Sequence, residues 1–176
     1  LLRKARVTAI RNDLHEPAAR VSISLGHALK AAGRYRDASR YFEDGLRLAK
    51  QVDDTKLLKA ASITLSDFLF WQGRVAQAIA HYEENIGDVE DFGDDVFTLK
   101  GIAMVGWCYV ICGRVARGIG LIEAIRSKAE SGQMIEVLIF AELMKAVSLI
   151  EIRNITEAEA CLARLLSYPE DTLGHY

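Results

Sequence analysis

The sequence lacks any apolar run long enough to cross a membrane. Its longest, from Ile102 to Cys112, falls well short of the roughly 20 residues that a spanning helix needs, so we expect no membrane contact. The chain also opens without a secretory signal, since Leu1-Leu2-Arg3-Lys4 has neither an initiator Met nor an apolar core. We therefore expect a fragment of a longer protein.

Cysteine and net charge are scarce as well. Three cysteines, an odd number, do not make a disulfide framework, which favours a cytoplasmic protein. Cys108 and Cys112 share a predicted helix, but a zinc site would need about two further ligands nearby, so we interpret both as small buried hydrophobes. With 22 basic and 24 acidic residues the net charge is −2, so no overall field attracts nucleic acid.

Catalytic patterns are missing too. The four histidines, His15, His27, His81 and His175, are scattered and have no paired nucleophile. The stretch from Gly113 to Gly120 superficially resembles a phosphate loop, but it lacks the Gly-Lys-Ser/Thr ending and follows a predicted helix rather than a strand. We expect no enzymatic activity, no cofactor and no metal.

What the sequence does contain is a period. Gly33, Gly73 and Gly113 stand 40 residues apart, and a further step reaches Arg153. Since hydrophobic residues make up 51% of the chain and charged residues 26%, there is enough apolar material for a continuous core. The period favours a short array of repeated units over one irregular domain.

Four further sets of equivalent positions, which we call columns, repeat at the same spacing. Five residues past each turn stands a small residue: Ala38, Ala78, Gly118 and Ala158. Four residues later stands a large one: Phe42, Tyr82, Ile122 and Leu162. Before the turns stand small Gly26, Ser66, Gly106 and Ala146, then large Leu29, Leu69, Tyr109 and Leu149. Small residues let two helices approach closely, and large ones fill the space between neighbouring hairpins.

The coarse prediction is helix throughout, in hairpins. First helices are expected near 18–32, 56–72, 96–112 and 135–152, and their partners near 35–51, 75–91, 115–130 and 155–167. Asp94 or Asp95 can cap the helix that follows. We divide the single expected domain into 1–17 (the second helix of a truncated repeat), then repeats 18–54, 55–94, 95–133 and 134–176.

These columns resemble the tetratricopeptide repeat. Leu25-Gly26, Ala38 and Phe42 match its Leu-Gly and Ala-x3-Phe elements, with Leu29 in place of the aromatic. The 40-residue length is similar to a longer variant common in bacterial signalling ATPases, nucleotidyl-cyclase-linked ATPases and LuxR-type transcriptional regulators. The resemblance implies an all-α, right-handed superhelical solenoid of antiparallel hairpins that binds proteins.

In such a solenoid the first helices line the concave side. One helical face then gives the candidate partner-binding residues: Ile23, His27, Lys30, Asp67, Phe70, Trp71, Lys100, Met104, Trp107, Phe140 and Met144. Leu143 belongs to the same face, and Arg20 lies at its rim. This surface suits an apolar or amphipathic peptide, although several of its residues can equally well cap the core. Family members that grip a chaperone's C-terminal carboxylate use Lys and Asn, and of the matching positions here only Lys100 fits.

Two charged stretches leave alternatives open. The segment from Glu83 to Asp95 carries seven acids and no base; it is a solvated turn or a patch for a basic partner. Arg3, Lys4, Arg6, Arg11 and Arg20 form a basic cluster that we interpret as a solvated helix face rather than a nucleic-acid site.

The sequence therefore predicts a non-enzymatic cytoplasmic scaffold that binds a protein or peptide in its concave groove. The alternative is a regulatory or self-association segment of a larger bacterial signalling ATPase, nucleotidyl cyclase or transcriptional regulator. It would dock on other domains of the same chain or form a homodimer.

Overall fold

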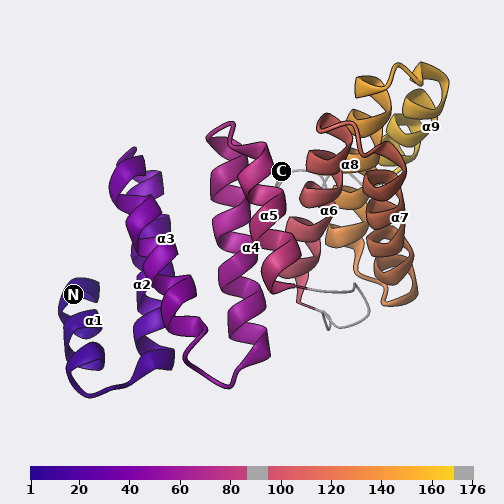
Figure 1. Cartoon of the computed structure of the whole chain (residues 1–176). Helices are drawn as coiled ribbons and strands as arrows, with labels where there is room; N and C mark the ends of the chain where they lie inside the picture. The colour runs from indigo at the N-terminus through magenta and orange to yellow at the C-terminus, as the bar shows by residue number, and fades with distance from the viewer. Residues whose placement is uncertain (87–94, 169–176) are drawn as a thin grey trace. The chain divides into compact units, whose positions relative to one another are not determined.

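The computed structural model describes residues 1–86 and 95–168, and every regular element in these ranges is an α-helix (Figure 1). In the first range the helices are α1 (Leu2–Arg11), α2 (His15–Ala31), α3 (Tyr35–Ala49), α4 (Thr55–Trp71) and α5 (Val75–Asn85). In the second they are α6 (Val96–Ile111), α7 (Val115–Ser131), α8 (Ile135–Glu151) and α9 (Ile155–Leu166). The predicted all-α class is confirmed.

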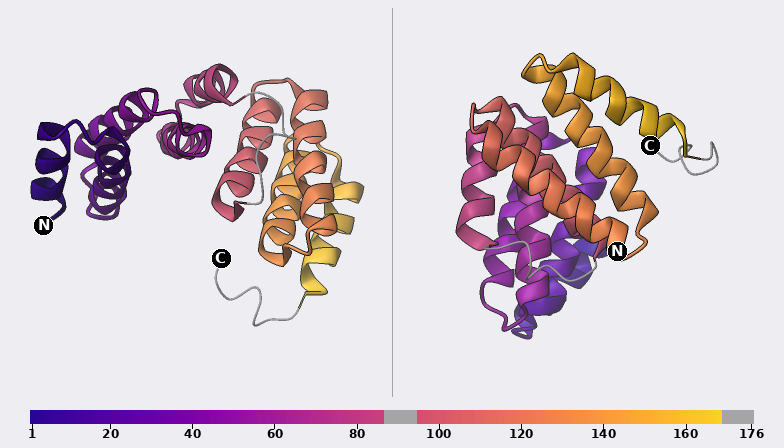
Figure 2. Two further views of the ribbon diagram at one scale, coloured as in Figure 1. Left: turned by 90° about the horizontal axis from the view of Figure 1, so that it is seen from below. Right: turned by 90° about the vertical axis from the view of Figure 1, so that its right-hand side faces the viewer.

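The helices pair as the period predicts. Consecutive helices pack as hairpins α2–α3, α4–α5, α6–α7 and α8–α9. The contacts divide the chain into two compact units, Leu1–Ile86 with α1–α5 and Gly87–Tyr176 with α6–α9. In the first unit α1 packs on α2 and α3 on α4, and in the second α8 packs on both α6 and α7 (Figure 2). The single domain and its repeat boundaries stay predictions.

Most predicted helix ends lie close to the observed ones. The largest difference is at α5, which ends at Asn85 with Ile86 as its C-cap, so the prediction of a helix to residue 91 is wrong. Helix α2 begins at His15 rather than at residue 18 and so takes Glu16 and Pro17 into its first turn. Acidic residues and proline are both favourable there. The predicted cap Asp94 and most of the acidic stretch from Glu83 to Asp95 lie outside the described residues.

Each hairpin turns on a residue in the left-handed region. The φ angles are 72° at Gly33, 75° at Gly73, 78° at Gly113 and 61° at Arg153. The next N–H then reaches back to the preceding helix, as when Arg34 donates to the carbonyl of Leu29 at 2.8 Å. This closes the helix end. Glycine adopts that φ without strain. The 40-residue spacing of the glycines therefore follows from the need for a left-handed residue in each turn.

Two kinds of turn join one hairpin to the next. Asp54 and Asp95 each cap the following helix, with their carboxylates accepting the backbone N–H of Leu57 at 3.0 Å and of Thr98 at 2.7 Å. The turns before α2 and α8 instead pass through left-handed Asp13 and Gln133, with φ of 54° and 53°. The sequence predicted a cap at Asp94 or Asp95 but not this second type, because no glycine stands at its left-handed position.

The small columns are buried where two helix backbones cross. A Cβ added to Gly26 would lie 2.5 Å from the Phe42 ring, and one added to Gly106 would lie 2.5 Å from the Ile122 side chain. Gly118 is tighter still, because a Cβ there would collide with the carbonyl oxygen of Gly106. Small residues in the columns are therefore required for the approach of the helices.

The large columns fill the space beside these crossings, with one exception. Phe42, Tyr82 and Ile122 are at most 4% exposed, whereas Leu162 is 39% exposed. Leu162 departs because α9 buries Cys161 and Leu165 instead.

Ion pairs accompany the apolar packing of the second unit. Lys145 bonds Glu123 of α7 at 2.5 Å and Glu157 of α9 at 3.2 Å. The buried Glu142 carboxylate accepts two bonds from Arg164, at 3.2 and 3.1 Å. Although burial of Glu123 opposes it, hydrogen bonds from Lys145 and Arg126 hold the pKa of Glu123 below its ordinary value. Helix α8 is thus tied to both neighbours.

Two glycines on α7 allow a test of how closely α7 packs against α6. Gly118→Ala should destabilise the chain by about 1–3 kcal/mol, because its methyl group overpacks against Gly106 and Val110. Gly120 has no atom near its Cβ position, so Gly120→Ala should stabilise by about 0.5–1 kcal/mol through helix propensity alone. Urea unfolding followed by circular dichroism measures both, and equal effects of the two substitutions would contradict the close crossing.

Candidate partner-binding site

The eleven candidate residues all lie on first helices. In the first unit, α2 carries Ile23, His27 and Lys30, and α4 carries Asp67, Phe70 and Trp71. In the second unit, α6 carries Lys100, Met104 and Trp107, and α8 carries Phe140 and Met144. Helix α2 contacts α4, and α6 packs on α8. Each unit therefore presents its own first-helix face.

One carboxylate organises the face of the first unit. Asp67 on α4 accepts a bond from the Lys30 ammonium on α2 at 3.0 Å and from the Trp71 indole N–H at 2.9 Å. The Phe70 and Trp71 rings meet edge to face at 5.2 Å between centroids. Trp71 is 69% exposed, so a large aromatic surface is held in a fixed orientation in solvent.

His27 lies beside this carboxylate. Its ring meets the buried Phe42 ring edge-on at 5.1 Å. Partial burial of the ring and the nearby Lys30 charge lower the pKa of His27 below 6.5, and Asp67 partly opposes them. A histidine whose folded pKa is lowered contributes stability that is present above pH 6.5 and is lost as the pH falls through the folded pKa. Above 6.5 the face therefore presents a neutral imidazole.

In the second unit, Lys100 is the central polar group. Its ammonium bonds Glu136 of α8 at 2.9 Å and lies 5.2 Å from the centre of the Phe140 ring, close enough for a cation–π contact. Trp107 is partly buried, whereas Met104 is 4% and Met144 7% exposed. Both methionines thus contribute mainly packing, and the polar and aromatic groups form the accessible surface.

The six candidate residues of the first unit also divide into accessible residues and residues that mainly pack against the core. His27 and Trp71 are exposed, and Lys30 and Asp67 are partly exposed. Ile23 and Phe70 are partly buried and pack against the core of the unit. The assignment of all eleven to a partner-binding surface stays a prediction.

Sequence reasoning missed Glu136, the partner of Lys100. The spacing offered a signal, because Lys30 and Asp67 are 37 residues apart and Lys100 and Glu136 are 36 apart. A base in one repeat followed by an acid about one repeat later marks a contact between neighbouring first helices.

The described part of the chain shows neither a metal-binding cluster nor a membrane-spanning helix. No group of three or more His, Cys, Asp or Glu in it could hold a metal ion, and none of its helices has the length and apolar character to cross a membrane. Cys108 is buried as expected, but Cys112 is exposed. The interpretation of both as buried hydrophobes is therefore wrong for Cys112.

Comparison with known proteins identifies the repeat. Residues 20–52 match the family model of the tetratricopeptide repeat. No curated protein gives a significant match.

Solved structures extend the likeness in fold to most of the chain. Two of these are crystal structures of nearly identical tetratricopeptide-like repeats from a Podospora anserina protein described as a kinesin light chain. A point variant matches with a TM-score of 0.75 at 14% identity, covering 94% of this chain and 82% of that one. The other matches with a TM-score of 0.72 at the same identity and coverage.

The charges around His27 give a test of this geometry. Lys30→Met should raise the pKa of His27 towards 6.5, and Asp67→Asn should lower it further. Titration of the imidazole protons by NMR measures both, with the signal assigned through His27→Gln. Lys56→Met, which removes an exposed lysine from the start of α4, should leave the titration unchanged. Shifts of the same sign in both test variants would contradict the arrangement.

Residues 20–52 carry the sequence of a tetratricopeptide repeat, and the chain as a whole has the fold of an array of such repeats.

Proposed function

We propose that the first-helix faces bind a peptide or helix of a partner protein and that the chain is a non-enzymatic interaction scaffold. Tetratricopeptide repeats are generally protein-interaction scaffolds, and this repeat fold is typically non-catalytic. The binding face and the type of ligand are the proposed part. A cytoplasmic location and a bacterial signalling context remain predictions from the sequence.

The exposure of Trp71 is the observation that carries the proposal. A tryptophan that is 69% exposed leaves a large apolar area in water, and tryptophan is enriched among residues that dominate binding energy. Its indole is already fixed by Asp67 at 2.9 Å. Little side-chain freedom is then lost on binding, which favours affinity.

The groups around Trp71 define the ligand chemistry. Lys30 and Asp67 neutralise one another at 3.0 Å, and His27 is held neutral above its lowered pKa. The face therefore offers an aromatic anchor beside a hydrogen-bonding pair without net charge. An amphipathic peptide that places one apolar side chain on Trp71 and polar groups along Lys30 and Asp67 fits this surface.

Peptide selection tests the proposal. Peptides selected from a random display library on the 176-residue chain should bind Trp71→Ala at least about 30-fold more weakly, the loss of a hot-spot residue worth about 2 kcal/mol. Fluorescence polarisation measures the affinities. Leu166→Ala, which shortens an 81% exposed side chain on α9, is the matched control and should bind as the wild type does. If peptides bind both variants equally, the Trp71 face is not the site.

The alternative is self-association. Helix α1 exposes Leu2, Val7 and Ile10, each at 39–44%, and α9 exposes Leu162 at 39% and Leu166 at 81%. Contiguous exposed apolar surface marks sites of association. A chain that pairs through α1 or α9 would act as a self-association segment of a larger regulator.

Light scattering over a range of concentrations decides this alternative. A homodimer formed through α1 should show a mass that rises with concentration, and Val7→Glu should abolish the rise because it places a charge in the interface. Leu166→Glu makes the same test for α9. A mass that stays monomeric up to the highest soluble concentration contradicts self-association.

A further inference from the structure

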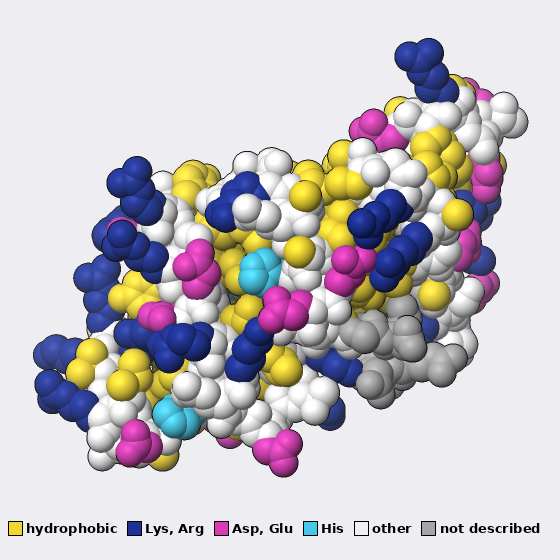
Figure 3. All heavy atoms as spheres, viewed as in Figure 1, with side chains coloured by type: hydrophobic (Ala, Val, Ile, Leu, Met, Phe, Trp, Pro, Cys, Tyr) yellow, Lys and Arg dark blue, Asp and Glu magenta, His cyan; other side chains and the backbone are white. Residues whose placement is uncertain are grey.

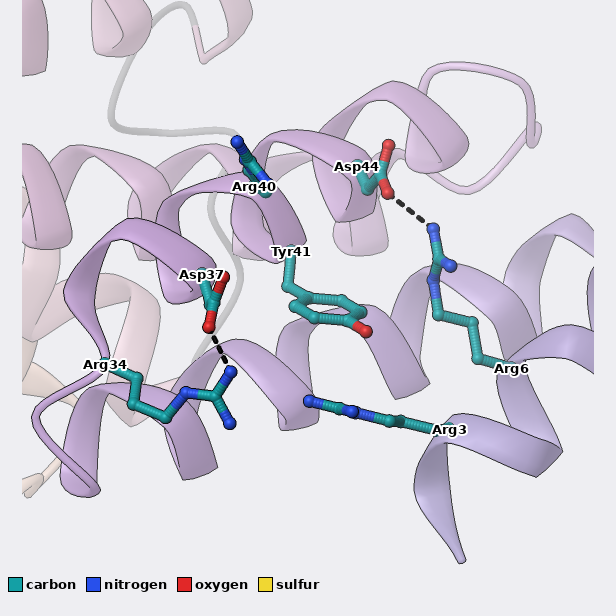
Figure 4. A pocket seen from close by; sticks show the side chains of 7 residues that line it. All are labelled: Arg3, Arg6, Arg34, Asp37, Arg40, Tyr41 and Asp44. Carbon is teal, nitrogen blue, oxygen red and sulfur yellow. Dashed lines mark hydrogen bonds and ion pairs between the residues drawn. The ribbon is translucent and has the colours of Figure 1, made fainter.

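A second surface of the first unit gathers arginines from segments far apart in the sequence. A pocket of about 310 Å³ is lined by Arg3 and Arg6 of α1, Arg34 of the first hairpin turn, and Asp37, Arg40, Tyr41 and Asp44 of α3 (Figure 4). Basic side chains gather over the α1–α3 part of the molecule (Figure 3). The pocket belongs to second helices and their turn, so it is separate from the first-helix face.

The lining has an excess of positive charge. Four arginines face two aspartates, which leaves a net charge of +2 within one pocket of a chain whose total charge is −2. Arginine stays protonated at any physiological pH. The local charge is therefore permanent and opposite in sign to that of the whole chain.

Arg6 is the fixed member of the group. Its guanidinium donates to the Ser22 hydroxyl at 2.8 Å and to the Asp44 carboxylate at 2.5 Å, and it lies 5.3 Å from the centre of the Tyr41 ring. Only 17% of its side chain is exposed. Arg6 thus joins α1, α2 and α3 and forms a rigid wall.

Arg3 and Arg40 differ from the other two arginines. Arg34 is paired with Asp37, and Arg6 with Asp44, whereas Arg3 and Arg40 make no ion pair within the described residues. In Figure 4 the side chain of Arg3 extends beneath Tyr41 towards Arg34, and Arg40 also lines the pocket. The net charge of +2 is thus carried by two guanidinium groups that have free donors.

We propose that this pocket binds a phosphorylated side chain of a peptide segment from a partner protein. A phosphate monoester carries a charge of about −1.5 to −2 at neutral pH, which matches the excess in the lining. Its oxygens accept paired N–H bonds from planar guanidinium groups. A single carboxylate matches only half of that charge. The 310 Å³ volume equals that of about ten water molecules, enough for the phosphoryl group and the side chain that bears it.

Fluorescence polarisation with defined peptides tests the assignment. The probe is a labelled Gly/Ala peptide with one central phosphoserine, and its unphosphorylated and glutamate forms are the comparisons. The wild-type chain should bind the phosphopeptide at least about tenfold more tightly than either comparison, with an affinity that falls as salt is added. Equal binding of the glutamate peptide, or no saturable binding of the phosphopeptide, would overturn the proposal.

Two charge-matched double variants locate the site. Arg3→Gln/Arg40→Gln should weaken phosphopeptide binding about tenfold or more, because it removes the unpaired guanidinium groups and leaves Arg6 in place. Lys4→Gln/Arg11→Gln removes the same charge from exposed positions of α1 outside the pocket and should change binding less than about twofold. Equal losses would mean that only the overall surface charge attracts the peptide, against the proposal.

Two further measurements separate the remaining explanations. Arg3→Lys/Arg40→Lys keeps the charge but loses the paired donors, so it should bind at least several-fold more weakly than the wild type; full retention would contradict guanidinium recognition. Inorganic phosphate should compete only at concentrations well above that of the phosphopeptide. Competition at equal concentration would assign the pocket to the free anion instead of a peptide. Circular dichroism confirms that every variant is folded.

Discussion

The close approach of two helix backbones within each hairpin is the constraint on which the structure depends. At Gly26, Gly106 and Gly118 there is no room for a Cβ atom beside the facing helix. This contact fixes the direction of each second helix against its first helix and leaves the large residues Phe42, Tyr82 and Ile122 to fill the space alongside. Because the hairpin is rigid, the polar side chains on its outer surfaces occupy defined positions.

Sequence reasoning succeeded where one residue type is physically required. Only a residue that tolerates positive φ closes the hairpin turn, so Gly33, Gly73 and Gly113 marked the turns directly. Sequence reasoning failed where several residue types meet the same structural requirement. Asp13 and Gln133 adopt the same φ without glycine, and the burial of Met104 and Met144 depends on how far α8 packs across α6. A helical face predicted from spacing alone cannot separate these methionines from exposed Trp71.

The arginine pocket shows a second limit of sequence reasoning. Arg3 and Arg6 were recognised as basic, but Arg34 and Arg40 come from the following repeat and reach them only through the packing of α1 on α2 and α2 on α3. From the sequence alone, the basic residues near the N-terminus were interpreted as a solvated helix face. In the folded chain, Arg3 and Arg6 of that cluster line one pocket around Tyr41 together with Arg34 and Arg40. In a repeat protein, residues that share a site are often separated by about one repeat in the sequence rather than by one helical turn.

Five ion pairs between repeats span about that distance, and in each of them the base comes first. Arg6–Asp44, Arg20–Asp54, Lys30–Asp67, Lys50–Glu84 and Lys100–Glu136 each join a base to an acid 34–38 residues later. The exposed pairs among them add only about 0–1 kcal/mol each to stability, so the apolar columns hold the array together. The pairs instead set the orientation of polar groups on each face and neutralise most of them. An incoming ligand therefore meets few uncompensated charges. Where two arginines remain unpaired beside fixed ones, as at Arg3 and Arg40, the surface becomes selective for an anion.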